Sequence, residues 1–152
     1  MIEPNPDLSD RLRRVRSQDT VVPMGVSQSG AKLTYRKFDD AEFNSFSDSQ
    51  VTGLSEYGLK PAAELEISTA PLRDILAANN VPHEFDFLSV DCEGMDVEVL
   101  ESNDWESFRP RWIIVEDYQW DSSDDSEIAK LLKSVGYVMR IKLGFSYIYC
   151  LK

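Results

Sequence analysis

Asp91 and Glu93 are the residues whose types and spacing offer the clearest chemistry in this sequence. They follow a nearly continuous apolar run at 85–90 and precede Gly94, where the backbone can turn into a helix. Such a run is typical of a strand that is buried on both faces. Because the two carboxylates alternate with Cys92, both could face one cleft and take a proton from a substrate. The same acids are equally compatible with capping of the helix that follows.

Acidic residues also follow two other predicted strands, at positions 3 and 116–117. In open α/β sheets, ligands bind outside the carboxyl ends of the strands, so acids at several strand ends can meet at one site. Glu3 stands where an acid commonly binds the ribose hydroxyls of a nucleoside cofactor; alternatively, it is a solvated acid that favours the dipole of the next helix. Glu116 and Asp117 line the same cleft or its rim, and Tyr118 and Trp120 follow closely enough to reach a substrate.

A metal site is a third interpretation of these acids, because clustered oxygen ligands suit Mg²⁺ or Ca²⁺. The spacing lacks the regular loop of a calcium motif, and the single histidine, His83, excludes a three-histidine zinc site. Cys92 has no basic neighbour in the sequence that would lower its pKa, so we interpret it as a packing residue. We therefore predict no metal ligands.

Strands that alternate with helices must position these residues. The sequence predicts strands at 21–26, 32–38, 64–68, 85–90 and 111–115, helices at 6–16, 71–79, 95–102 and 126–134, and a closing hairpin of strands at 137–141 and 145–151. Asn5 caps the first helix and Thr69 the second, whereas the polar stretch 39–60 is predicted to be a loop with little regular structure. This order predicts an α/β protein with a mostly parallel sheet and a C-terminal antiparallel hairpin.

Length and composition are those of one globular domain over residues 1–152, with Trp105, Phe108 and Trp112 in its core. The net charge of −11 argues against binding to nucleic acid or anionic lipid, since both need surplus Lys and Arg. Between positions 84 and 127 there are 15 acids and 2 arginines, so the acidity surrounds the strand-end motif. No membrane span or signal peptide is visible, and two cysteines suggest a reduced, cytoplasmic protein.

Five motifs of this chain resemble the FkbM-type methyltransferases. They are Ile-Glu-Pro-Asn-Pro at 2–6, Val-Ser at 26–27, Asn-Ser-Phe-Ser at 44–47, Asp-Phe-Leu-Ser-Val-Asp-Cys-Glu-Gly-Met-Asp at 86–96 and Asn-Asp-Trp-Glu-Ser-Phe-Arg-Pro-Arg at 103–111. The resemblance covers nearly the whole chain, and the block at 86–111 is its most specific part. It implies a Rossmann-like fold, the cofactor S-adenosylmethionine and O-methylation of a sugar, a glycan or another small metabolite.

The resemblance also implies roles for individual residues. Glu3, with Asn5, is expected to bind the ribose of the cofactor, and Ser27 is expected to lie near its adenine. Asp91 and Glu93 are expected to face the reacting methyl group and the acceptor, with Asp91 contacting the cofactor as well. One of these two carboxylates would take the proton of the acceptor hydroxyl. The expected acceptor contacts are Asn44, Glu116 and Tyr118.

One departure from the family concerns the first strand and the glycine-rich turn that cradles the methionine part of the cofactor. Only two residues precede Glu3, and the seven glycines include no Gly-x-Gly. We therefore expect an N-terminally incomplete domain with its first strand missing, a poorly held first sheet edge and a low affinity for the cofactor. Two alternatives to an active enzyme are a non-catalytic remnant or interaction module of the same fold and a Mg²⁺-dependent enzyme that uses the acidic cluster.

Overall fold

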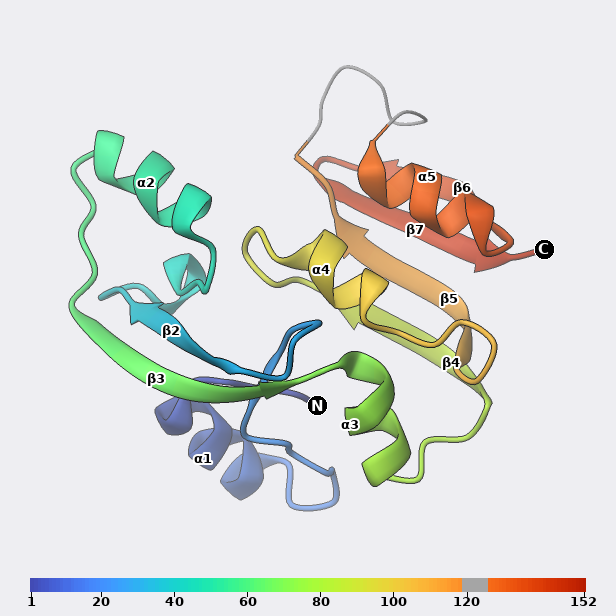
Figure 1. Ribbon diagram of the computed structural model, residues 1–152, viewed down its shortest axis with the longest axis horizontal. Helices are drawn as coiled ribbons and strands as arrows, with labels where there is room; N and C mark the ends of the chain where they lie inside the picture. Colours follow the sequence, from blue (N-terminus) through green and yellow to red (C-terminus); the bar gives the residue numbers. More distant parts are fainter. Residues whose placement is uncertain (119–125) are drawn as a thin grey trace.

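Two separate sheets form the frame of the protein (Figure 1). The computed structural model describes residues 1–118 and 126–152. The smaller sheet has the strand order β1 (Gly25–Val26), β3 (Ala63–Ala70), β2 (Lys32–Lys37). The larger sheet has the order β4 (Glu84–Val90), β5 (Arg109–Glu116), β7 (Ser146–Leu151), β6 (Tyr137–Leu143).

The strand directions confirm the α/β class and the closing hairpin but not a mostly parallel sheet. In the described part of the chain, β1 pairs with β3 and β4 with β5 in parallel, whereas β2–β3, β5–β7 and β6–β7 are antiparallel. Both sheets are therefore mixed, and the prediction of a mostly parallel sheet is wrong. Leu33 and Tyr35 of β2 alternate with polar residues, a pattern that suits an antiparallel sheet with one solvated face.

Five α-helices lie within the described residues. They are α1 (Pro6–Val15), α2 (Asp48–Glu56), α3 (Leu72–Ala78), α4 (Asp96–Glu101) and α5 (Glu127–Ser134). As predicted, the Asn5 side chain accepts a hydrogen bond from the backbone N–H of Asp7 and caps α1, and Ser126 caps α5 in the same way. Across residues 1–118 and 126–152, none of the helices has the length and apolar character that crossing a membrane requires.

Two local predictions are wrong. The stretch 39–60 contains a 3₁₀ helix, η1 (Ala41–Phe43), and α2, because Ser47 accepts a hydrogen bond from the backbone N–H of Gln50 and so supplies a helix start. Thr69 does not cap α3: its hydroxyl pairs with Ser27, and the hydroxyl of Ser102 instead accepts the first helical N–H, that of Leu72, at 2.9 Å.

The core lies between the larger sheet and the helices α4 and α5, which cover the same face of that sheet (Figure 1). Ile113 and Val115 of β5 are fully buried there, and Trp105 and Phe108 are buried as predicted. The opposite face of the sheet is different. Phe87 of β4 and Trp112 of β5, which are register partners, are 49% and 43% exposed. The predictions that 85–90 is buried on both faces and that Trp112 is a core residue are therefore wrong.

The two sheets approach each other at their edges without pairing. In the described residues β4 is hydrogen-bonded on one side only, to β5. On the other sheet, a parallel bridge joins Ile2 to Val22, just before β1. Met1–Glu3 and β4 thus face each other across a space that both help to line. The acids predicted at the strand ends lie at this junction.

Candidate functional site

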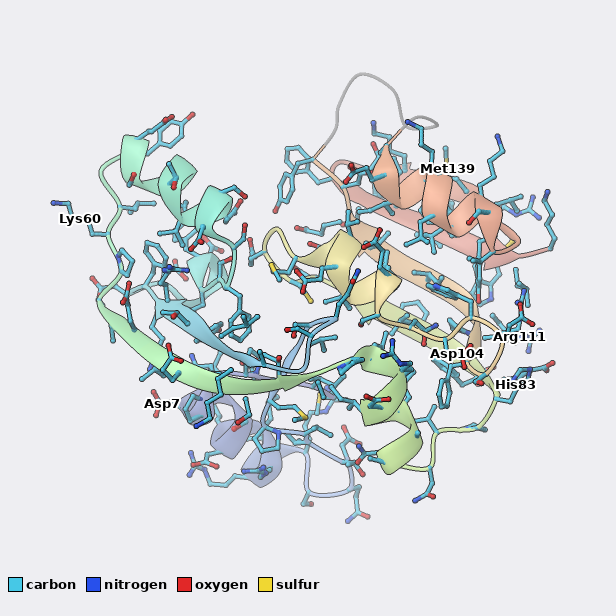
Figure 2. All side chains as sticks on the ribbon, viewed as in Figure 1. Asp7, Lys60, His83, Asp104, Arg111 and Met139 are labelled. Atoms are coloured by element: carbon cyan, nitrogen blue, oxygen red, sulfur yellow. The ribbon has the colours of Figure 1, made fainter. Side chains whose placement is uncertain are left out.

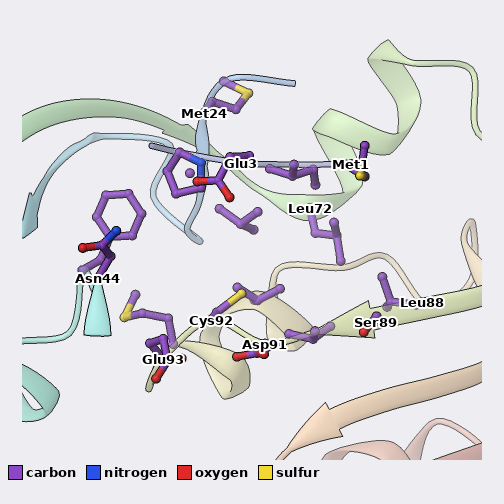
Figure 3. A pocket seen from close by; sticks show the side chains of 18 of the residues that line it. Met1, Glu3, Met24, Asn44, Leu72, Leu88, Ser89, Asp91, Cys92 and Glu93 are labelled. Atoms are coloured by element: carbon purple, nitrogen blue, oxygen red, sulfur yellow. The ribbon is translucent and has the colours of Figure 1, made fainter. Parts of the chain in front are cut away.

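A cavity of about 730 Å³ occupies the junction between the two sheets (Figure 3). Its walls are mostly apolar, with Val26, Leu72 and Val90 among the lining residues. Glu3 and Asn44 lie on one side of the opening, and Asp91 and Glu93 lie on the other (Figure 3). An apolar cavity of this size with a few convergent polar groups is the usual form of a small-molecule site.

Glu3 is held in place by backbone pairing. Its N–H donates to the carbonyl of Val22 at 3.0 Å, and the N–H of Val22 donates to the carbonyl of Met1 at 2.9 Å. The Glu3 carboxylate accepts a hydrogen bond from the backbone N–H of Asn5 at 2.7 Å. Burial raises the pKa of Glu3, and the hydrogen bond from Asn5 offsets part of that rise. A half-buried carboxylate is therefore presented at the cavity with one oxygen already fixed.

The segment after β4 places Asp91 and Glu93 by an unusual backbone conformation. Glu93 has φ 48° and Gly94 has φ 92°, both in the left-handed region, which a residue other than glycine seldom adopts. The hydroxyl of Ser45 donates to the Glu93 carbonyl at 2.7 Å and stabilises this turn. A side chain on Gly94 would be strained at this φ and would meet Ser47 at 3.3 Å. The turn directs the chain from the strand into α4 within a few residues.

Neither Asp91 nor Glu93 caps α4. The N-cap residue is Met95, which makes no side-chain hydrogen bond to the helix, and it is Asp96 that accepts a bond, from the N–H of Cys92 at 3.2 Å. The capping interpretation of the two acids is therefore wrong. Both line the cavity instead, so their carboxylates are available to a bound molecule.

The acids at the strand ends raise one another's pKa values. Burial, followed by the charges of Asp91 and Glu116, raises the pKa of Glu93 to about 7. Burial and then the charge of Glu116 raise the pKa of Asp91. The pKa of Asp96 rises to about 6, mainly by burial. A carboxylate with a pKa near neutrality is well matched to accept a proton from a substrate at physiological pH.

Glu116 and Tyr118 lie at the end of β5, beside the acids of β4, but do not line the cavity itself. The hydroxyl of Tyr118 donates to the Glu116 carboxylate at 2.7 Å, and the Tyr118 ring lies 5.0 Å from that of Phe145. Both residues therefore belong to the rim. Trp120, the other aromatic side chain predicted to reach a substrate, lies outside the described residues.

Asn5 and Ser27 lie near the cavity without lining it. Asn5 is buried as the cap of α1, and the Ser27 hydroxyl, also buried, shares a 2.6 Å hydrogen bond with Thr69. Asn44 does line the cavity, and its Oδ1 accepts the backbone N–H of Phe38 at 2.7 Å. Of the predicted site residues, the structure thus brings four together in the cavity: Glu3, Asn44, Asp91 and Glu93.

Tyr35 and Phe46 line the cavity and were missed by sequence reasoning. Tyr35 is an inward position of the alternating strand β2, and Phe46 follows a loop that returns to that strand through a bridge between Ser45 and Arg36. The Asn-Ser-Phe-Ser motif was a signal for Phe46, but nothing local distinguishes Tyr35 from an ordinary core aromatic residue.

Cys92 lines the cavity as a packing residue, whereas His83 lies away from it. Burial is the main cause that raises the pKa of the Cys92 thiol, to about 12, which agrees with the predicted packing role. His83 lies with Arg111 and Asp104 at the opposite end of β4 and β5 from the strand-end acids (Figure 2). Among residues 1–118 and 126–152, no three His, Cys, Asp or Glu side chains are arranged to hold a metal ion.

An α/β protein with acidic side chains around a cavity at its strand ends has the features of the α/β proteins that bind a ligand at the carboxyl ends of their strands. A family model described as the methyltransferase FkbM domain matches residues 1–139. The chain belongs to this FkbM methyltransferase family. No curated protein and no solved structure matches the chain.

Proposed function

We propose that this protein binds S-adenosylmethionine in the cavity and transfers its methyl group to a hydroxyl of a sugar, a glycan or another small metabolite. The observation that carries the proposal is the meeting of Glu3, Asp91 and Glu93, from distant parts of the chain, around one cavity. Membership of the FkbM methyltransferase family supports a methyl donor of this kind.

The residues present fit this cofactor. The Glu3 carboxylate accepts hydrogen bonds, as ribose hydroxyls require, and the Asn5 N–H fixes its orientation. Ser27 shares a buried hydroxyl hydrogen bond with Thr69, and Val26, the residue before it, lines the cavity where the adenine is expected. The local excess of carboxylates favours a cation, although solvent screens this effect. When bound, S-adenosylmethionine supplies an electrophilic methyl group on a positively charged sulfur.

Glu93 is the proposed proton acceptor. The acceptor hydroxyl loses its proton to the Glu93 carboxylate as its oxygen becomes the nucleophile, and a pKa of about 7 suits that exchange. Asp91 raises the pKa of Glu93 by its charge and is proposed to orient the cofactor. Asn44, Glu116 and Tyr118 are proposed to contact the acceptor and hold it close to the methyl group, which is the main source of acceleration in such a transfer.

The decisive experiment is calorimetric titration of the purified chain with S-adenosylmethionine. We expect saturable binding that Asp91→Asn weakens about tenfold, as loss of one charged hydrogen-bonding partner does. Asp86→Asn is the matched control, because Asp86 is an exposed acid on β4, the strand that Asp91 follows. Its affinity should stay within about twofold of the wild type.

Three outcomes of this titration contradict the proposal. A folded chain that fails to bind S-adenosylmethionine at millimolar concentration would support the non-catalytic alternative. Equal losses from Asp91→Asn and Asp86→Asn would show that only net charge matters. Binding that requires added Mg²⁺ would support the metal-dependent alternative, for which the described residues offer no ligand set.

A cytoplasmic location also stays a prediction, based on the two free cysteines.

A further inference from the structure

Tyr35 is a buried tyrosine at the cavity that the proposed mechanism does not use. It lies in β2, is 5% exposed and lines the cavity together with Glu3, Asn44 and Phe46. Its ring packs against that of Phe46, with 4.8 Å between the ring centroids and 52° between the planes. The ring therefore has a packing role, and the hydroxyl needs a separate explanation.

The hydrogen bond from Asn44 indicates which way the Tyr35 hydroxyl acts. Asn44 Oδ1 accepts the backbone N–H of Phe38 at 2.7 Å, and the amide NH₂ of Asn44 can donate to the phenol oxygen of Tyr35. This bond lowers the pKa of Tyr35, as a bond donated to the phenol oxygen does. With its oxygen accepting from Asn44, the hydroxyl is free to donate its own proton in another direction.

The surroundings keep that hydroxyl protonated. Burial and the charges of Glu3 and Glu93 outweigh the bond from Asn44, so that the pKa of Tyr35 lies far above its ordinary value. The phenol is therefore a hydrogen-bond donor throughout the physiological pH range and cannot serve as a base. Glu3, whose charge acts on Tyr35 more strongly than that of Glu93, is an acceptor only.

We propose that Tyr35 is a cofactor-binding residue. One ribose hydroxyl of the cofactor donates a hydrogen bond to Glu3, and the Tyr35 hydroxyl donates a hydrogen bond to that same ribose hydroxyl. A hydroxyl group both donates and accepts, so it needs one partner of each kind. Glu3 supplies the acceptor and Tyr35 the donor, and both line the same cavity. The proposal rests on the proposed function, because it takes Glu3 as the ribose-binding residue.

The test compares S-adenosylhomocysteine with its 2′-deoxy and 3′-deoxy analogues by calorimetric titration. Tyr35→Phe retains the ring against Phe46 and removes the hydroxyl alone, so the melting temperature of the free protein should be unchanged. We expect Tyr35→Phe to weaken binding of S-adenosylhomocysteine about tenfold. One of the two deoxy analogues lacks the ribose hydroxyl that Tyr35 contacts. For that analogue, Tyr35→Phe and the wild type should have the same affinity. Tyr57→Phe is the matched control, because it removes a phenol hydroxyl from an exposed side chain that does not line the cavity, and it should not change any of these affinities.

The outcomes separate this inference from the proposed function. If the wild type binds S-adenosylhomocysteine and Tyr35→Phe binds it with the same affinity, the proposed role of Tyr35 is wrong. The proposed function is then still supported. Equal weakening for all three ligands also overturns it, because the hydroxyl would then act on the shape of the cavity rather than on the ribose. Failure of the wild-type protein to bind any of the three ligands overturns both proposals.

Discussion

The two sides of the cavity differ in the surroundings of their polar groups. On the side of the smaller sheet, Glu3 accepts the N–H of Asn5, and Asn44 accepts the N–H of Phe38. On the side of the larger sheet, burial and the charges of neighbouring carboxylates, including Glu116, raise the pKa values of Asp91 and Glu93. The first side is suited to hold a neutral, hydroxyl-bearing group in a fixed orientation. The second side is suited to exchange a proton.

The two sheets that carry these sides also differ in how they are stabilised. The core packs on one face of the larger sheet, around Ile113 and Val115. In the smaller sheet, Tyr35 is the one buried residue of β2, and Ile67 of β3 is only partly buried. The proton-exchanging side is thus built on the more stable part of the molecule, where crowded charges can be held without unfolding the chain.

The largest expected effect is on catalysis at the charged side. Glu93→Gln removes the proposed proton acceptor and should lower methyl transfer by about 10²–10⁴-fold. Release of S-adenosylhomocysteine, measured with the acceptor that the wild type methylates, provides the test. In the wild type the rate should rise with pH through about 7, as Glu93 loses its proton. Glu84→Gln, at the opposite end of β4, is the control. Normal turnover by Glu93→Gln would exclude Glu93 as the base.

The second prediction concerns stability and compares one isoleucine from each sheet. Ile113→Ala in β5 should lower the free energy of unfolding by about 3 kcal/mol, because a fully buried side chain leaves a cavity. Ile67→Ala in β3 should cost about 1 kcal/mol, because that side chain is partly exposed. Urea denaturation of both variants measures the difference. Equal losses would contradict the view that the larger sheet carries the stability.

The third prediction uses pH. A carboxyl group whose pKa is raised in the folded state binds its proton more tightly there than in the unfolded chain, so its contribution to stability is lost as pH rises through the window between the two pKa values. For Glu93 this window extends from 4.5 to about 7. Glu93→Gln should therefore stabilise the protein at pH 8 by about 1 kcal/mol, after allowance for solvent screening.

Urea denaturation at pH 5 and pH 8 tests this pH dependence. The stability gain of Glu93→Gln at pH 8 should shrink at pH 5, where Glu93 is protonated in the folded protein. Glu84→Gln serves again as the control and should show no such dependence. A Glu93→Gln variant that is no more stable than the wild type at pH 8 would show that the charged side is not strained.

The smallest expected effect is on the side of the smaller sheet. Arg36 of β2 pairs with Asp48 in the first turn of α2 at 2.7 Å, but the Asp48 side chain is 84% exposed. Asp48→Asn should therefore cost less than about 1 kcal/mol, and the loss should disappear in 1 M salt. Hydrogen exchange of the amides at 48–56 would report the change locally. A large, salt-independent loss would mean that α2 depends on this pair more than its exposure suggests.

Local patterns in the sequence predicted most of the elements and four of the residues that line the cavity. The apolar run at 85–90, the acids that follow it and the hairpin around Gly144 all lie where the sequence placed them. Helix α2 was missed because its start depends on one side chain, Ser47, within a polar stretch that resembles a loop. The direction of β2 against β3 was missed as well, since pairing across a long connection leaves little trace in either strand.

The surroundings of other side chains could not be predicted from the sequence, because their contact partners are distant along the chain. Ser27 follows a strand that reaches the cavity, yet its hydroxyl pairs with Thr69, which is 42 positions away. Tyr35 lies in a regular alternating strand, and only the return of the chain at Asn44 and Phe46 gives it a polar partner and a stacking partner. The exposure of Trp112 likewise depends on which face of the sheet the helices cover.

The unpaired edge of β4, beside the cavity, has a consequence for how the protein behaves in solution. An edge strand with an exposed aromatic residue such as Phe87 offers a template for pairing with another chain, and natural proteins guard such edges with charged side chains. Glu84 and Asp86 are exposed on this strand, and charged side chains at such positions oppose pairing with another chain. The net charge of the chain, which keeps molecules apart, falls to zero near the isoelectric point of about 4.5. Mild acid should therefore promote aggregation of the native protein before it causes unfolding.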